Sequence, residues 1–123
     1  MARILIIDDD DLTQSMLKIA LEQQGHDVYQ AFDGFQGIAL IREEKFDLII
    51  TDIWMPETDG LEVIQRVHQE FPHSKILAIS GGSNKCPGLE ALTVARALGA
   101  KKLLRKPFGE QELLEAIDAI AMT

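Results

Sequence analysis

Apolar and polar positions form two kinds of block along the chain. Short, nearly continuous apolar runs predict strands buried on both faces, and they occur at residues 3–7, 48–51 and 75–79. Two more polar runs, at residues 27–31 and 101–106, predict strands at the edges of the same sheet. Between these runs, apolar residues recur at intervals of three and four, which predicts helices.

A helix is expected after each strand, so the chain alternates strand and helix five times. The expected helices run from Leu12 to about Gln24, Gly34 to Glu44, Leu61 to Pro72, about Leu89 to Leu98 and over the last residues around Leu113 to Ile120. This alternation predicts an α/β fold with a parallel sheet covered on both faces. Three central strands and two edge strands indicate a doubly wound five-stranded sheet of order 2-1-3-4-5, a flavodoxin-like (βα)5 architecture.

The first helix carries two more detailed expectations. Its expected core-facing residues are Leu12, Met16, Ile19 and Ala20. At its start, Asp11 with Gln14 three residues later predicts a capping box, and Gly25 predicts its end.

Length and composition suit one soluble domain, which we expect to span residues 1–123. The net charge of −8 argues against nucleic-acid binding, because phosphates would be repelled. No apolar run is long enough to span a membrane, and the chain opens directly into a strand rather than a signal peptide. The single cysteine, Cys86, allows no internal disulfide, and a cytoplasmic location is expected.

Polar residues stand where the predicted strands end. Asp8 and Asp9 follow the first strand and Asp52 follows the third. Ser80 follows the fourth strand, and Lys106 ends the fifth. Because parallel strands end at one rim of the sheet, and ligands bind there near the switch in strand order, we expect these five residues to converge.

Three carboxylates so close together would repel one another by roughly 4 kcal/mol per close pair at an effective dielectric constant near 20. Either their pKa values rise or a cation lies between them. Oxygen ligands without His or Cys favour Mg²⁺ or Mn²⁺ over Zn²⁺. Ser80 and Lys106 would hold phosphoryl oxygens, and an ionised Asp52 would then be a nucleophile that forms an aspartyl-phosphate.

Four motifs in this order complete the pattern: IIDDD at 6–10, TDIWMPETDG at 51–60, AISGG at 78–82 and RKPF at 105–108. With these motifs the whole chain resembles a receiver domain of two-component response regulators, of the chemotaxis-regulator-like kind. The resemblance implies that Asp52 is the phosphoacceptor and that Ser80 and Lys106 contact the phosphoryl group. The implied Mg²⁺ ligands are Asp8, Asp9, Asp52 and the backbone carbonyl of Trp54. The resemblance also implies a cis peptide bond between Lys106 and Pro107.

The resemblance further implies the partners. A histidine kinase or phosphotransfer protein would donate the phosphoryl group, and a downstream effector protein would bind the switched surface. We expect no direct nucleic-acid binding, no membrane contact, and either a monomer or a dimer that forms on phosphorylation. The chain would not be an enzyme for external substrates, because its chemistry is limited to its own phosphorylation and dephosphorylation.

Two alternatives within the family stay open: a receiver excised from a longer regulator with an output domain, and a pseudo-receiver that binds partners without phosphorylation. A phosphatase with an aspartate nucleophile would need a second acid where the chain has Trp54. A flavodoxin-like cofactor binder would need hydroxyls and amides, rather than four aspartates, after the first strand. Receivers commonly carry Tyr or Phe at the position of Leu103, so we expect switching through the loop after Ser80 instead of a ring movement.

Overall fold

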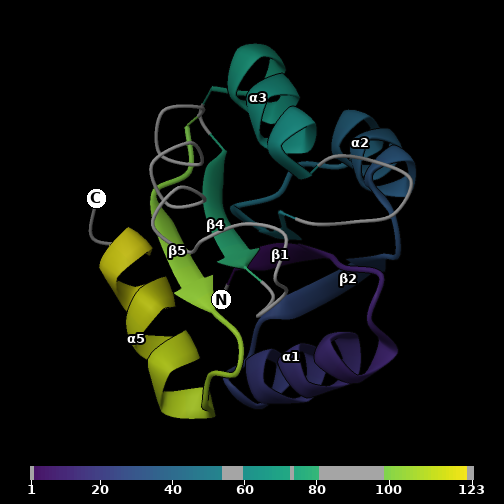
Figure 1. The fold of residues 1–123 in the computed structure, drawn as a ribbon. Coiled ribbons are helices and arrows are strands. Elements are labelled where there is room, and N and C mark those ends of the chain that lie inside the picture. The colour runs from purple at the N-terminus through teal and green to yellow at the C-terminus, as the bar shows by residue number, and fades with distance from the viewer. Residues whose placement is uncertain (1, 54–59, 73, 81–98, 122–123) are drawn as a thin grey trace.

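The structure is a computed structural model that describes residues 2–53, 60–72, 74–80 and 99–121. Its centre is a parallel five-stranded sheet with helices on both faces (Figure 1). The strand order is β2-β1-β3-β4-β5, which confirms the predicted doubly wound α/β fold.

The five strands lie where the hydrophobic pattern predicts them, to within one residue at each end. They are β1 (Arg3–Ile7), β2 (Asp27–Ala31), β3 (Leu48–Asp52), β4 (Lys75–Ser80) and β5 (Lys102–Arg105). Every residue of β3 is buried, whereas β2 and β5 each keep exposed or half-buried positions. The more polar runs are therefore the edge strands, as predicted.

Four helices lie within the described residues: α1 (Asp11–Gln23), α2 (Gly34–Glu43), α3 (Gly60–Glu70) and α5 (Glu110–Ala121). Helices α1 and α5 cover one face of the sheet, and α2 and α3 cover the other (Figure 1). The helix predicted over residues 89–98 falls outside the described residues. In the part of the chain that is described, no helix is long and apolar enough to cross a membrane.

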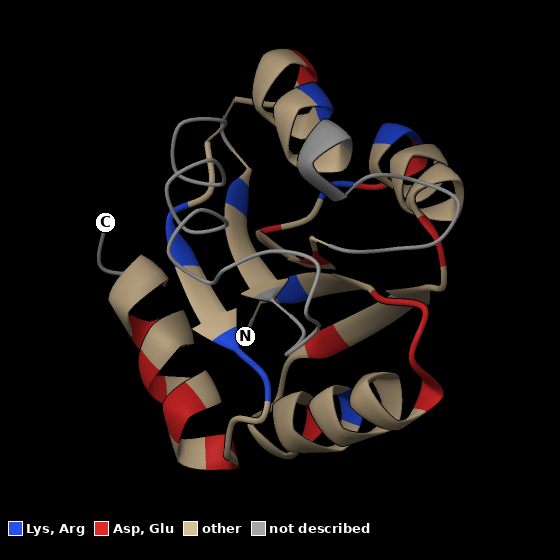
Figure 2. Ribbon diagram, viewed as in Figure 1, with Lys and Arg blue, Asp and Glu red and all other residues tan. Residues whose placement is uncertain are grey.

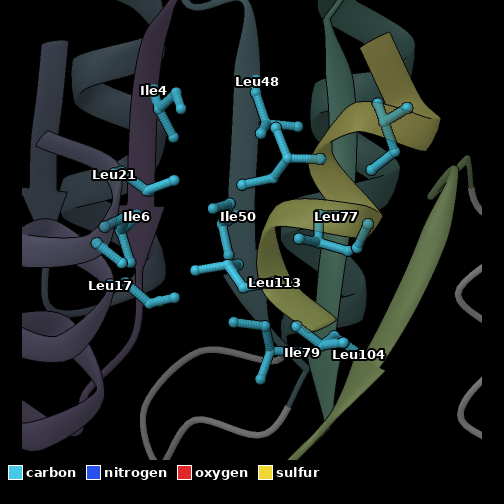
Figure 3. Close-up of a cluster of buried hydrophobic side chains, with 14 of the residues drawn as sticks. Ile4, Ile6, Leu17, Leu21, Leu48, Ile50, Leu77, Ile79, Leu104 and Leu113 are labelled. Carbon is cyan, nitrogen blue, oxygen red and sulfur yellow. The ribbon is translucent and has the colours of Figure 1, made fainter. Parts of the chain in front are cut away.

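Among the described residues, the buried hydrophobic side chains form two clusters, one on each face of the sheet. Side chains alternate along a strand, so Ile4 and Ile6 of β1 pack under α1 and α5, while Leu5 and Ile7 pack under α2 and α3. Figure 3 shows the first cluster, in which Leu17 of α1 lies beside β1. Because both faces of the central strands are covered, their carboxyl ends are held at a fixed rim.

The predicted core face of α1 is wrong for three of its four residues. The exposed fractions are 78% for Leu12, 42% for Met16 and 60% for Ile19; Ala20 alone is buried. The buried residues of α1 are Thr13, Gln14, Leu17, Ala20 and Leu21. The helix is thus turned by about one residue position from the predicted orientation. Two of its buried positions are polar, so the apolar periodicity pointed to the wrong face.

The predicted capping box at the start of α1 is also wrong. Asp10, rather than Asp11, is the N-cap, and its carboxylate accepts hydrogen bonds from Leu12 N at 3.3 Å and Thr13 Oγ1 at 2.6 Å. The predicted end is confirmed, because Gly25 has a φ of 87° just beyond the helix.

The orientation of α1 gives a first testable prediction. Leu17→Ala should lower the free energy of unfolding by about 2–5 kcal/mol, because it leaves a cavity under the helix. Leu12→Gln should change it by less than about 0.5 kcal/mol, because Leu12 lies at the surface. Urea denaturation of both variants measures the difference. A larger loss of stability in Leu12→Gln than in Leu17→Ala would show that α1 packs through the predicted face instead.

Candidate functional site

Two acidic residues lie where the central strands end. Asp8 immediately follows β1, and Asp52 is the last residue of the neighbouring strand β3. The ladder between β1 and β2 extends one residue past β1, since Asp8 N–H donates to the Ala31 carbonyl at 3.1 Å. The sheet itself therefore fixes the backbone that carries both carboxylates.

The structure brings four of the predicted site residues together. Carboxylate oxygens of Asp8, Asp9 and Asp52 lie within 4.8 Å of one another. Lys106 Nζ lies 3.0 Å from Asp8 Oδ2 and 3.4 Å from Asp52 Oδ2. Asp8 and Asp52 are buried, whereas Asp9 is exposed. Two carboxylates of the cluster are thus shielded from solvent, and the third is accessible to it.

Burial dominates the electrostatics of Asp8. It raises the pKa of the carboxyl above its ordinary value, although the hydrogen bond from Asp10 N–H and the charge of Lys106 act in the opposite direction. For Lys106, burial by itself would lower the pKa, but attraction by Asp52 and Asp8 outweighs burial and leaves the pKa raised. Lys106 is therefore a cation at neutral pH, and its ammonium group lies beside the two buried carboxyl groups of Asp8 and Asp52.

The remaining predicted site residues are placed only in part. Ser80 is the last residue of β4, and its backbone pairs in register with Arg105 of β5, so it lies at the same rim. Trp54, the source of the predicted carbonyl ligand, lies outside the described residues. The peptide bond between Lys106 and Pro107 is cis, as predicted.

Gln14 has a different role in the structure from the one that the sequence predicts. Gln14 was expected to cap α1, but its side chain is buried and its Nε2 donates to the carbonyls of Asp8 and Ala31 at 3.0 and 2.7 Å. A signal was present, because Gln14 precedes Leu17 and Leu21 by three and seven positions and so shares their helix face. A polar residue in phase with core leucines needs a buried partner.

The donor set fits a hard divalent cation. All three clustered side chains offer oxygen, and Mg²⁺ prefers one or two carboxylates together with water and substrate oxygens. No His or Cys, the ligands that favour Zn²⁺, belongs to the clustered group among the described residues. Asp8, Asp9 and Asp52 could therefore hold such an ion.

Comparison with known proteins identifies the family. The family model described as response regulator receiver domain matches residues 4–118. The chain belongs to this family. It is thus a receiver domain of the two-component type, as the motifs predicted.

Relatives of different overall architecture share this domain. The DNA-binding dual master transcriptional regulator RpaA of Synechocystis is 36% identical over 98% of this chain, which spans about half of RpaA, 49% of its length. The solved chemotaxis protein CheY4 of Vibrio cholerae is 29% identical, with a TM-score of 0.86 and 98% of both chains covered. A receiver domain protein of Methanospirillum hungatei is 32% identical, with a TM-score of 0.88, and the match covers 97% of this chain and 92% of that protein.

Leu103 distinguishes this chain from receivers that carry an aromatic residue at the same place. It is half-buried and packs against the core cluster beneath α2 and α3. The expectation that switching works through the loop after Ser80 concerns residues outside the described part, and it stays a prediction.

The raised pKa of Asp8 gives a second prediction. The folded protein binds the Asp8 proton more tightly than the unfolded chain does, so ionised Asp8 costs stability at neutral pH. In metal-free buffer, Asp8→Asn should therefore raise the free energy of unfolding at about pH 7. The gain should shrink as the pH falls and should vanish below the ordinary value of 3.8, where Asp8 is protonated in both states.

Urea denaturation across this pH range measures the effect. Asp118→Asn, which removes one exposed charge from α5, is the control and should change the free energy of unfolding at about pH 7 by less than about 0.5 kcal/mol. A loss of stability in Asp8→Asn at neutral pH would mean that the Lys106 ion pair outweighs the burial of Asp8.

Proposed function

We propose that this receiver domain is phosphorylated on Asp52 by the phosphohistidine of a histidine kinase or phosphotransfer protein. Phosphorylation then changes its affinity for an effector protein. The observation that carries the proposal is the cluster of Asp8, Asp9 and Asp52, with oxygens within 4.8 Å of one another and with Lys106 beside it. Both the nucleophile and the groups that would stabilise the transferred charge are therefore in one place.

In the transfer step, a carboxylate oxygen of Asp52 attacks the phosphorus atom and the phosphorus–nitrogen bond to the donor histidine breaks. The electron pair of that bond stays on the imidazole, which takes up a proton. Lys106 Nζ, 3.4 Å from Asp52 Oδ2, is close enough to donate to an oxygen of the incoming phosphoryl group. Ser80, at the end of β4, would bind another of its oxygens. The sheet holds Asp52 in place, so little reorganisation is needed.

Asp8, Asp9 and Asp52 would hold Mg²⁺, or Mn²⁺ in its place, together with the Trp54 carbonyl that the family resemblance implies. When bound, the ion neutralises charge on the phosphoryl oxygens. Asp9 is exposed and so reaches an ion that arrives from solvent, while Asp8 stays buried behind it.

We propose that the chain acts on no external substrate. The only reactions are phosphorylation of Asp52 and loss of that group to water. A phosphatase with an Asp52 nucleophile would need a general acid two positions later, where the chain has Trp54. A phosphorylation-independent pseudo-receiver is the second candidate, and the experiment below separates it from the first.

The output is proposed to be a protein contact rather than nucleic-acid binding by this domain. The net charge is −8, and Figure 2 shows acidic residues in the loop into α1 and along α5. RpaA is described as a DNA-binding transcriptional regulator and CheY4 as a chemotaxis protein, so relatives that share this domain are described in different roles. Output through a separate effector and output through an attached domain are both compatible with the site.

Phosphorylation can be tested by intact mass. After incubation with acetyl phosphate and Mg²⁺, the wild-type protein should gain one phosphoryl group. Asp52→Asn should gain none, because it lacks the nucleophile, and chelation of the metal should abolish the gain in wild type. Asp118→Asn is the matched control and should react as wild type does. A wild-type protein that gains no mass, while a known receiver reacts in parallel, would favour the pseudo-receiver.

Metal binding can be tested by thermal unfolding. Mg²⁺ at about 100 times its dissociation constant should stabilise the wild-type fold by about 2.7 kcal/mol, because it binds only the folded state. Asp9→Asn should lose most of this stabilisation, since it removes the exposed ligand of the cluster. If Mg²⁺ stabilised Asp9→Asn as strongly as wild type, the ion would be bound elsewhere.

A further inference from the structure

Gln14 connects α1 to the ends of β1 and β2. Its side chain lies on the buried face of the helix and is 1% exposed. Its Nε2 lies 2.7 Å from the Ala31 carbonyl oxygen, 3.0 Å from that of Asp8 and 3.3 Å from that of Ile6. All three partners are acceptors, so the orientation of the amide is fixed with its nitrogen toward the strand ends.

Asp8 is held through each of its polar atoms. Its N–H donates to the Ala31 carbonyl at 3.1 Å, and its carbonyl accepts from Gln14 at 3.0 Å. Its carboxylate accepts from Asp10 N–H at 2.9 Å and from Lys106 at 3.0 Å. Of these contacts, the one to Gln14 fixes the peptide plane that joins Asp8 to Asp9.

Asp9 depends on that peptide plane more than Asp8 does. Its side chain is exposed, so packing does not fix its direction. Nevertheless one of its oxygens lies within 4.8 Å of those of Asp8 and Asp52. The direction of the Asp9 side chain therefore depends on the conformation of the backbone that precedes it.

We propose that Gln14 is a positioning residue for the metal site. By holding the Asp8 carbonyl, it fixes the peptide between Asp8 and Asp9 and keeps the Asp9 carboxylate opposite Asp52. The inference rests on the proposed function, because it gives Gln14 a part in binding Mg²⁺. Residues that orient metal ligands without touching the metal typically change metal affinity by about 10- to 100-fold when they are replaced.

A merely structural role would leave a different signature. Gln14 also satisfies buried carbonyls, so its loss should lower stability in either case. Its Oε1 is buried and meets no hydrogen-bond donor among the described residues. Burial of this oxygen therefore costs free energy that an apolar side chain of similar size would not cost. The donor contacts of Nε2 therefore account for the presence of an amide here, and Mg²⁺ affinity distinguishes positioning from packing.

The test is a Mg²⁺ titration followed by amide shifts in nitrogen-15 NMR spectra. Gln14→Met has similar length but no donor, and its dissociation constant for Mg²⁺ should be about tenfold weaker than that of wild type. In metal-free buffer, the amide signals of Asp9 and Asp10 should also shift. The control is Leu21→Val, which alters an apolar side chain on the same buried face of α1 and should keep wild-type Mg²⁺ affinity.

The outcomes separate the two proposals. Wild-type affinity in Gln14→Met would overturn the positioning role and leave the proposed function intact. Absence of Mg²⁺ binding in wild type would overturn the metal site and this inference with it. If Gln14→Met does not fold, Gln14→Asn decides the question, because it keeps an amide but retracts it by one methylene. It should weaken Mg²⁺ binding, and unchanged affinity would refute the inference.

Discussion

The site depends on one ammonium group held between two buried carboxylates. Lys106 immediately follows β5 and contacts Asp8 after β1 and Asp52 at the end of β3. Two buried carboxylates side by side would be costly, and the lysine offsets part of that cost. Yet burial still raises the pKa of Asp8, so one lysine does not compensate the cluster fully. The negative charge that Lys106 leaves uncompensated would favour a cation bound between the carboxylates.

The loop between β1 and α1 makes this arrangement possible in a few residues. Asp10 contacts the elements at both ends of this loop, since its carboxylate caps α1 and its N–H donates to the carboxylate of Asp8 after β1. Gln14 adds the contact to the Asp8 carbonyl from within the helix. The three consecutive aspartates therefore differ in their surroundings: Asp8 is buried, Asp9 is exposed and Asp10 caps α1. The three aspartates are alike in sequence and different in role.

The strands and the part of the site formed by Asp8, Asp52 and Lys106 were predictable from two general properties of parallel sheets. Buried parallel strands read as apolar runs, and their ends share a rim, which was enough to bring Asp8, Asp52 and Lys106 together. The face of α1 was not predictable in this way. Gln14 can be buried because its amide donates to the carbonyls of Asp8 and Ala31 at the ends of two strands. The spacing of apolar residues along the sequence carries no information about such hydrogen-bond partners. Leu12 remains exposed although it fits the apolar pattern.

The packing of β5 explains how a single lysine can be placed so accurately at an edge strand. Leu104 is buried in the cluster beneath α1 and α5, and Leu103 packs on the cluster beneath α2 and α3. Packing on both faces of the sheet therefore holds β5 in place just before Lys106. The ammonium of Lys106 is thus oriented toward Asp8 and Asp52, and in the proposed transfer it would lose little conformational freedom on binding a phosphoryl group. Because Leu103 stands where many receivers carry an aromatic ring, the contact of β5 with the cluster beneath α2 and α3 is aliphatic at this position.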